Sequence, residues 1–459
     1  MRQAPRFLFL LCVLLCIACT AEPASSPTDT QQASGYPISP EKLAGLADAI
    51  ANQEQTLLAT WYPLVVDPVN GGYHSNFDAD WQLMQDQPKM IVTQARHVWT
   101  ASQAFMRYPA DSLYLGVARH GYNFLRDHMW DAQHGGFYTL VDQQGNAILN
   151  GHNGYKRAYG NAFGIYALSA FAKASGDPEV LDFAKRAFQW LDQHSYDTVY
   201  GGYYQFMTRA GKASHKGYAG TPPKDQNSSI HLLEAFTALY DVWPDPTVRA
   251  RLEEMLVLIR DTMVLDNKYL QLFFDKEWHP VSYRDSSDAT RKANLYFDHV
   301  SVGHDVETAF LMQEAAHALG IPDESTMLVG KSMVDHALEV GWDDALGGFY
   351  DYVYYLKDST KATVLGDTKN WWAQAEGLNA LLLMHTLYPD DGAAYFDKFA
   401  QQWTFINEYL IDHERGGWYS GSIDKEPGRI HSQKSGIWKG NYHTVRALMH
   451  TSDMLRTEF

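Results

Sequence analysis

The chain has 459 residues, of which 54 are acidic and 37 are basic, so its formal net charge is −17. Nucleic acids and anionic membrane surfaces attract Lys and Arg, and this charge therefore argues against both as partners. Apolar residues make up 46% of the chain, which is enough for a large buried core. The acidic excess by itself mostly indicates solubility.

The first residues are typical of a bacterial export signal. Arg2 and Arg6 precede an apolar run over residues 7–17, which is too short for a permanent membrane span. The run leads into Cys19 and resembles a lipoprotein cleavage box, with Cys16 where that box normally has Leu. We expect a signal peptide over residues 1–18, acylation of Cys19, and an exported lipoprotein anchored in the periplasm or on the outer membrane. Residues 19–37, rich in Ser, Thr, Pro and Gln, are expected to form a flexible tether.

Cysteine usage restricts the chemistry. The three cysteines of the chain are Cys12, Cys16 and Cys19, so the exported domain has no thiol nucleophile, disulfide or cysteine zinc site. Neither a Walker-type phosphate loop nor a dinucleotide-binding Gly motif is present. We therefore expect no nucleotide cofactor, and chemistry based on His, carboxylates, Tyr or Lys.

A turn motif recurs along the rest of the chain: an Asp, three residues, then Gly-Gly-aromatic. The period is roughly 70 residues, and one interval is twice as long. That interval contains Asp266 followed by Leu270-Gln271-Leu272, which we interpret as a copy without glycines. The clear copies begin at Asp67, Asp131, Asp197, Asp343 and Asp412. The motif therefore predicts six structural repeats.

The segments between the turns have helical periodicity. Apolar residues from Tyr166 to Ala172 and from Leu181 to Leu191 each follow one helical face, and Gly176-Asp177-Pro178 separates them. Each repeat is therefore a helical hairpin with a short extended turn. The last repeat stays apolar instead of ending in a polar cap, which favours a closed ring over an open solenoid. We predict an all-α domain over residues 38–459, an (α/α)6 barrel of six hairpins with short β turns.

Polar and aromatic residues interrupt one helix of every repeat, about 24 to 34 residues after the turn. Equivalent positions in a ring face a common axis, so these groups should converge on one cavity at one end of the barrel. These groups lie on single helix faces where the spacing is three, four or seven residues, as in the groups that begin at Asn227, His304 and His443. They are Arg96 with Trp99, Tyr159 with Asn161, Asn227 with His231 and Glu234, His304 with Glu307, Trp371 and Trp372 with Glu376, and His443 with Arg446.

Several kinds of site remain open at this point. A single such His is more often a satisfied core residue, but three in phase favour a shared site. A metal site could use His231 with Glu234 or His304 with Glu307, although the cations Arg96, Lys224 and Arg446 at the same positions oppose a metal. A glycoside hydrolase could use two of Glu234, Glu307 and Glu376 as flanking carboxylates.

The residue types suit proton transfer on a sugar. Trp99, Trp371, Trp372, Trp438 and Tyr442 offer flat apolar faces for pyranose rings, and the polar groups offer hydrogen bonds to hydroxyls. Two histidines on opposite sides of one carbon can act as base and conjugate acid. This pattern favours an epimerase or isomerase.

Four motifs in order resemble the cellobiose 2-epimerase branch of the N-acylglucosamine 2-epimerase superfamily, from about Gln53 to Leu455. They are Lys224 to Phe236, Gly303-His304-Asp305-Val306-Glu307, Trp371-Trp372-Ala373-Gln374-Ala375-Glu376, and Trp438-Lys439 with Tyr442-His443. The resemblance implies an (α/α)6 barrel that needs no external cofactor and acts on an oligosaccharide. We expect a monomer or weak dimer. It implies inversion of carbon 2 of the reducing-end sugar through ring opening and an enediolate.

The resemblance also implies roles for individual residues. His304 and His443 match the acid/base histidines, while Glu307 and Asn227 match groups that assist ring opening. Arg96, Tyr159, His231, Glu234, Trp371, Trp372, Glu376 and Trp438 are the expected substrate-binding residues. Gln226, Ala373, Gly440-Asn441 and a polar stretch from Tyr283 to Asp298 depart from the family pattern. These departures leave the sugar open between cellobiose or mannobiose and, second, a monosaccharide for aldose–ketose isomerisation.

Overall fold

The computed structural model describes residues 39–459 apart from 267, 322–323, 357–358, 360 and 458–459. The expected signal peptide, the acylation site Cys19 and the tether lie outside the described residues. Among the described residues, no helix is both long and apolar enough to cross a membrane.

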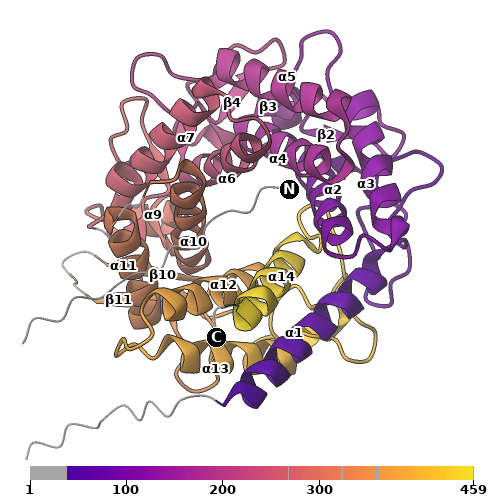
Figure 1. Ribbon diagram of the computed structural model, residues 1–459. Coiled ribbons are helices and arrows are strands. Elements are labelled where there is room, and N and C mark those ends of the chain that lie inside the picture. Colours follow the sequence, from indigo (N-terminus) through magenta and orange to yellow (C-terminus); the bar gives the residue numbers. More distant parts are fainter. Residues whose placement is uncertain (1–38, 267, 322–323, 357–358, 360, 458–459) are drawn as a thin grey trace, which may run out of the picture. The chain divides into compact units, whose positions relative to one another are not determined.

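Helices in two concentric layers form a closed ring (Figure 1). The inner layer consists of α2 (Ile91–Arg107), α4 (Ala158–Ser175), α6 (Gln226–Val242), α10 (Val302–Leu319), α12 (Trp371–Leu387) and α14 (Tyr442–Thr457). Each inner helix packs on the next, and α14 packs on α2. The outer layer consists of α1 (Pro40–Trp61), α3 (Ser112–Phe124), α5 (Pro178–Ser195), α7 (Pro246–Leu258), α11 (Glu324–Gly341) and α13 (Tyr395–Tyr409). The predicted all-α barrel of six hairpins is confirmed.

The burial pattern explains the two layers. Helix α4 is buried almost all round, because it contacts α2 and α6 in the ring and α5 outside it. Helix α5 buries one stripe that includes Phe183, Phe188 and Leu191, and its other face is polar, as expected for a surface helix. Gly176, with φ 66°, ends α4, and the Asp177 side chain caps α5. This capped stop and start is the hairpin turn that the sequence indicated.

Short strands connect the hairpins. The antiparallel pairs are β1 (Lys89–Met90) with β2 (Leu140–Val141), β3 (Tyr155–Arg157) with β4 (Phe206–Thr208), β5 (Lys224–Asp225) with β8 (Phe273–Phe274), β6 (Val264–Leu265) with β7 (Tyr269–Leu270), and β10 (Tyr352–Tyr355) with both β9 (Val300–Ser301) and β11 (Ala362–Gly366). Strands β1, β3, β5 and β9 lead directly into inner helices. The two remaining α-helices of the described residues, α8 (Asp288–Ala293) and α9 (Leu295–Asp298), lie in the polar stretch that the sequence analysis identified.

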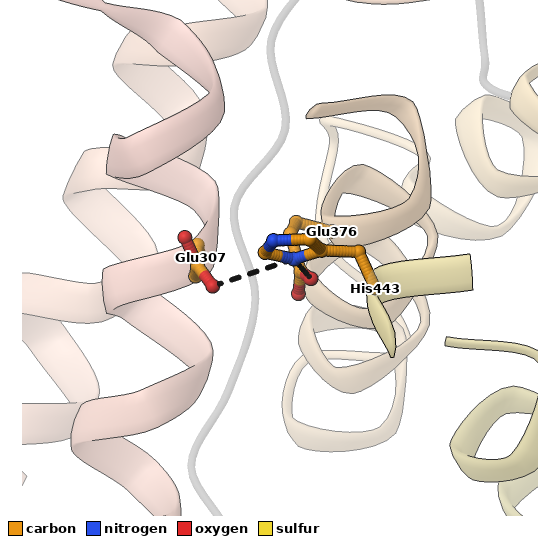
Figure 2. A group of neighbouring side chains, drawn as sticks. All are labelled: Glu307, Glu376 and His443. Atoms are coloured by element: carbon orange, nitrogen blue, oxygen red, sulfur yellow. Dashed lines mark hydrogen bonds and ion pairs between the residues drawn. The ribbon is translucent and has the colours of Figure 1, made fainter. Parts of the chain in front are cut away.

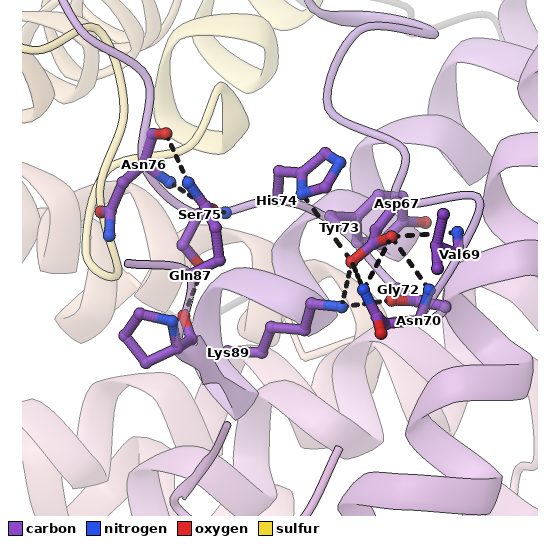
Figure 3. Close-up of polar contacts among 12 residues, drawn as sticks. Asp67, Val69, Asn70, Gly72, Tyr73, His74, Ser75, Asn76, Gln87 and Lys89 are labelled. Carbon is purple, nitrogen blue, oxygen red and sulfur yellow. Dashed lines mark hydrogen bonds and ion pairs between the residues drawn. The ribbon is translucent and has the colours of Figure 1, made fainter. Parts of the chain in front are cut away.

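The repeated Asp turn has a common internal structure. Asp67 accepts the backbone N–H groups of Val69 and Asn70, both at 3.0 Å, and the buried Lys89 donates to Asp67 at 2.8 Å (Figure 3). Gly72 has φ 65°, and a Cβ there would lie 2.5 Å from a side-chain oxygen, so the turn requires glycine. The same ion pair recurs as Lys156–Asp131, Lys224–Asp197, Lys369–Asp343 and Lys434–Asp412.

The sixth turn corrects the predicted register. Val264 pairs with Leu270, as Val66 pairs with Tyr73 in the first turn, so Leu270 takes the aromatic position and Leu265 takes the Asp position. Asp266 is exposed and plays no part in a turn ion pair among the described residues. In four of the five other turns the buried Lys stands two residues before the inner helix, and Val300 holds that place before α10. Cation and anion are therefore replaced together, which avoids leaving one buried charge alone.

Candidate active site

Polar and aromatic side chains from all six inner helices meet at one cavity of about 290 Å³. It lies at the N-terminal ends of these helices: Asn227 is the second residue of α6, His304 the third of α10 and His443 the second of α14. Every residue predicted to be catalytic or to bind the substrate lines it except Glu234 and Glu376. The lining residues are Arg96, Tyr159, Asn227, His231, His304, Glu307, Asn370, Trp371, Trp372, Trp438, Lys439 and His443.

His304 is fixed by the strand that precedes its helix. Its Nδ1 lies 2.7 Å from the Ser301 hydroxyl, and its ring centroid lies 4.7 Å from that of Trp372. Burial, with smaller contributions from nearby positive groups such as Arg96, lowers the pKa of His304 to about 3. His304 is therefore neutral at neutral pH. Its Nε2 has no hydrogen bond to a described residue and remains available to a ligand.

His443 is held by a carboxylate. Its Nδ1 lies 2.6 Å from Glu376 Oε1 and 3.8 Å from Glu307 Oε1 (Figure 2). Its ring centroid lies 5.8 Å from that of Trp372, so both catalytic candidates contact the same indole. Burial, reinforced by the charges of Arg96 and Arg446, lowers the pKa of His443 well below its ordinary value.

A fully buried guanidinium organises the carboxylates behind the cavity. Arg446 donates to Glu307 at 2.8 Å and contacts Glu376 at 2.7 Å, and it also bonds to Glu234. Burial opposes ionisation of Glu234, but Arg446 and the 2.9 Å hydrogen bond to His231 outweigh it and lower the pKa of Glu234 to about 2. The expectation that Glu234 and Glu376 bind the sugar is therefore corrected, because both lie behind the lining and hold His231 and His443.

Glu307 is the carboxylate that reaches the cavity. Burial, together with the charge of Glu376, raises its pKa to about 7 despite the contact with Arg446. Its second oxygen, Oε2, has no hydrogen-bond partner among the described residues. Near neutral pH this group can both accept and return a proton.

The geometry of these residues bears on whether the site could hold a metal ion. Ligand atoms of Glu307, Glu376 and His443 lie within 4.8 Å of one another, which is compatible with a metal site. Arg446 Nη2 already contacts both of these carboxylates, and a cation between them would have to displace the guanidinium. The pair His231 and Glu234 is engaged in its own hydrogen bond. The residues present therefore fit a metal poorly.

Four residues of the predicted constellation have other roles. Trp99 stacks on Tyr166 and lines a separate cavity at the C-terminal ends of the inner helices. Tyr442 is buried and bonds to Glu234 and Arg446, so it forms no rim. Lys224 belongs to the third Asp turn. Asn161, in the predicted cluster, accepts the backbone N–H of Phe137 and supports the second turn.

Sequence reasoning missed Asn370, Ser301 and the cavity-facing position of Lys439. Asn370 Oδ1 is buried without a partner among the described residues and belongs to the cavity lining. Lys439 donates to the carbonyls of Trp418 and Lys434, and burial lowers its pKa to about 7. Asn370 lies one residue before the motif that begins at Trp371, and Ser301 lies two residues before the motif that begins at Gly303. A search of the residues just upstream of each motif would therefore have found both.

Comparisons with known proteins agree with this geometry. A profile of the N-acylglucosamine 2-epimerase (GlcNAc 2-epimerase) family matches residues 71–447. A cellobiose 2-epimerase of Bacteroides fragilis is 30% identical over 85% of this chain and 94% of its own length. A D-mannose isomerase of Marinomonas mediterranea is 25% identical over 86% and 94%. The solved structure of a cellobiose 2-epimerase from Spirochaeta thermophila superposes with a TM-score of 0.77 at 28% identity, covering 91% of this chain and 98% of that one.

Proposed function

This chain belongs to the N-acylglucosamine 2-epimerase family, and we propose that it inverts carbon 2 of the reducing-end sugar of a β-1,4-linked disaccharide. The cellobiose 2-epimerases among its relatives support the reaction and the substrate class. The enzyme is accordingly a sugar 2-epimerase of the isomerase class. The observation that carries the proposal is the placement of two imidazoles, His304 and His443, around one indole in one cavity.

The reaction proceeds through an open-chain sugar. Ring opening moves the proton of the carbon 1 hydroxyl to a base and returns a proton to the ring oxygen, leaving an aldehyde. One neutral histidine then takes the proton from carbon 2, and the electron pair moves into a carbon 1–carbon 2 double bond to give an enediolate. After rotation about the carbon 2–carbon 3 bond, the other histidine, which has taken up a proton from solvent and reacts as the imidazolium, delivers that proton to the opposite face. The first histidine then returns the substrate proton to solvent. The reaction involves no net oxidation or reduction, and its steps use no external cofactor.

The cavity suits each step. The pKa of Glu307 near 7 fits the proton transfers of ring opening, and Asn227 lines the same space. A lowered pKa keeps the histidine that acts as the base neutral, and the negative charge of the enediolate favours protonation of the other histidine. The N-terminal ends of six helices and the Arg96 guanidinium face the negative charge of the enediolate, which stabilises it.

Aromatic side chains hold the sugar. Trp371 and Trp372 line the cavity, and Trp438, 49% exposed, stands at its mouth. Arg96 donates to the Tyr159 hydroxyl at 3.2 Å and keeps its Nε unpaired among the described residues. Flat faces and unpaired donors together match a pyranose ring with its hydroxyls.

A second candidate is aldose–ketose isomerisation. The D-mannose isomerases among the relatives favour it, because the same enediolate protonated at carbon 1 gives a ketose. Glycoside hydrolysis has less support. Glu234, Glu307 and Glu376 all contact one guanidinium on the same side of the cavity, whereas hydrolysis needs two carboxyl groups that flank the glycosidic oxygen.

The test is a product assay on the purified domain. Cellobiose, mannobiose, lactose, glucose and mannose are each incubated with the enzyme, with and without EDTA, and the products are separated by chromatography. We expect the 2-epimer of a disaccharide, formed equally with the chelator. A ketose as main product would select the isomerase, and released monosaccharide from a disaccharide would overturn the proposal.

A further inference from the structure

A second, larger chamber adjoins the catalytic cavity. Its volume is about 700 Å³, and it shares Tyr159, Asn227 and Trp438 with the lining of the catalytic cavity. Strands β3, β4 and β5 contribute to its walls, so it extends over the starts of α4 and α6. The catalytic cavity has about 290 Å³. If one sugar unit fills that cavity, the outer chamber has room for two more.

Two buried polar atoms of the outer chamber lack hydrogen-bond partners among the described residues. The guanidinium of Arg157, on β3, makes no hydrogen bond or ion pair with a described residue, and its Nε is buried. Oδ1 of Asp225, on β5, is also buried and has no hydrogen-bond partner in the described part of the chain. Buried polar atoms rarely stay without a partner, and such exceptions call for an explanation. A sugar hydroxyl, which accepts from a guanidinium and donates to a carboxyl group, satisfies both.

Aromatic rings complete the chamber. The Arg157 guanidinium lies 5.3 Å from the ring centroid of Phe206 and 5.4 Å from that of Tyr218. Tyr218 is 47% exposed and Tyr296 is 60% exposed, so both present ring surface to a ligand. Arg157 and Asp225 bring opposite charges to this wall, so a neutral sugar fits it better than a uronate.

We propose that the outer chamber is a sugar subsite for the third unit of a linear oligosaccharide, counted from the reducing end. This inference rests on the proposed function. The reducing-end unit lies between the two catalytic histidines, the second unit lies against Trp438, and Arg157, Asp225 and Tyr218 contact the third. A trisaccharide is therefore a better substrate than the disaccharide of the same linkage.

Chain-length kinetics test the proposal. We compare kcat/KM for cellobiose with cellotriose and for mannobiose with mannotriose, and expect an advantage of about tenfold for the trisaccharide, since remote contacts contribute to transition-state binding. Tyr218→Ala should bring the ratio of trisaccharide to disaccharide kcat/KM close to one, and Arg157→Met should lower it. Arg186→Met is the matched control: Arg186 also lies over a ring, that of Phe183 at 5.2 Å, but lines neither chamber. It should keep the wild-type ratio.

The outcomes separate this inference from the proposed function. Epimerisation of cellobiose with equal kcat/KM for cellotriose, or an advantage that survives in Tyr218→Ala, overturns the subsite and leaves the epimerase standing. If no sugar is turned over, calorimetry with cellobiose and cellotriose still decides whether the outer chamber binds a third sugar unit. Tighter binding of cellotriose that is lost in Tyr218→Ala supports the subsite, and equal affinities overturn it.

Discussion

At the scale of single residues, the two catalytic candidates differ in what holds them. His443 Nδ1 bonds to a carboxylate and His304 Nδ1 to a hydroxyl, both at hydrogen-bond distance. A bond with an ionised partner is roughly twice as strong as a neutral one. Glu376 should therefore do more to orient its histidine, and to stabilise the imidazolium, than Ser301.

This difference predicts that substitutions of Glu376 and of Ser301 lower kcat to different extents. Glu376→Gln should lower kcat by roughly 10²-fold with little change in KM, because a misplaced acid–base group acts on the chemical step. Ser301→Ala is the comparison and should have a smaller effect on kcat. Steady-state kinetics of both variants, with circular dichroism to confirm folding, make the measurement. A Glu376→Gln enzyme with the kcat of the wild type would contradict the role of Glu376.

The pKa of Glu307 predicts how kcat/KM depends on pH. Its pKa is raised to about 7, first by burial and then by Glu376, so it loses its proton as pH rises through neutrality. If the ionised form accepts the proton in ring opening, kcat/KM rises through about pH 7 and then levels off. In Glu307→Gln this limb should disappear, with low activity at every pH. A variant that keeps the wild-type limb would assign it to another group.

At the scale of elements, the Asp turns act as repeated anchors for the inner helices. Five copies use a buried Lys–Asp pair, and the sixth replaces both charges with Leu265 and Val300. A buried pair contributes little net stability compared with apolar residues, but the removal of one partner leaves an uncompensated charge. The sixth turn shows that a neutral version is compatible with the fold.

A double-mutant cycle on the first turn tests this interpretation. Lys89→Val leaves the buried Asp67 carboxylate without its cation and should cost about 3–5 kcal/mol of unfolding free energy. Adding Asp67→Leu should make the loss smaller than the sum of the two single losses, by about 0.5–3 kcal/mol. Urea unfolding measures all four proteins. Strict additivity would show that the two side chains do not act as a pair.

At the scale of the whole molecule, α1 closes the outer layer against α14. Leu58 of α1 is fully buried at this seam, and Glu54 pairs with Arg107 of α2 at 3.1 Å. Leu58→Ala should cost about 2–5 kcal/mol, as for other core leucines. Exposed Leu113→Ala is the control. We expect a single unfolding transition in both proteins, because the ring has no free end, and a separate early transition in Leu58→Ala would contradict this.

Sequence periodicity predicted the ring and its repeat number, because turn glycines and helical spacing are local signals. It also brought together the residues from Arg96 to His443 that line the cavity. The sequence did not predict how far each side chain lies from the cavity along the barrel or behind its lining. Trp99 lies on a turn of α2 that faces the other end of the barrel, and Glu376 lies behind His443, although both have the same helical phase as lining residues. The register of the Asp266 turn failed because its identifying residues are replaced.

The central claim is proton exchange at carbon 2 by His304 and His443, and the most direct test follows deuterium. The enzyme is incubated with cellobiose in deuterium oxide, and the products are examined by mass spectrometry and proton NMR. We predict a 2-epimer that carries one deuterium at carbon 2, and no epimer from His304→Ala or His443→Ala. Epimer without deuterium from a long incubation, or near-normal turnover in either single variant, would contradict the account.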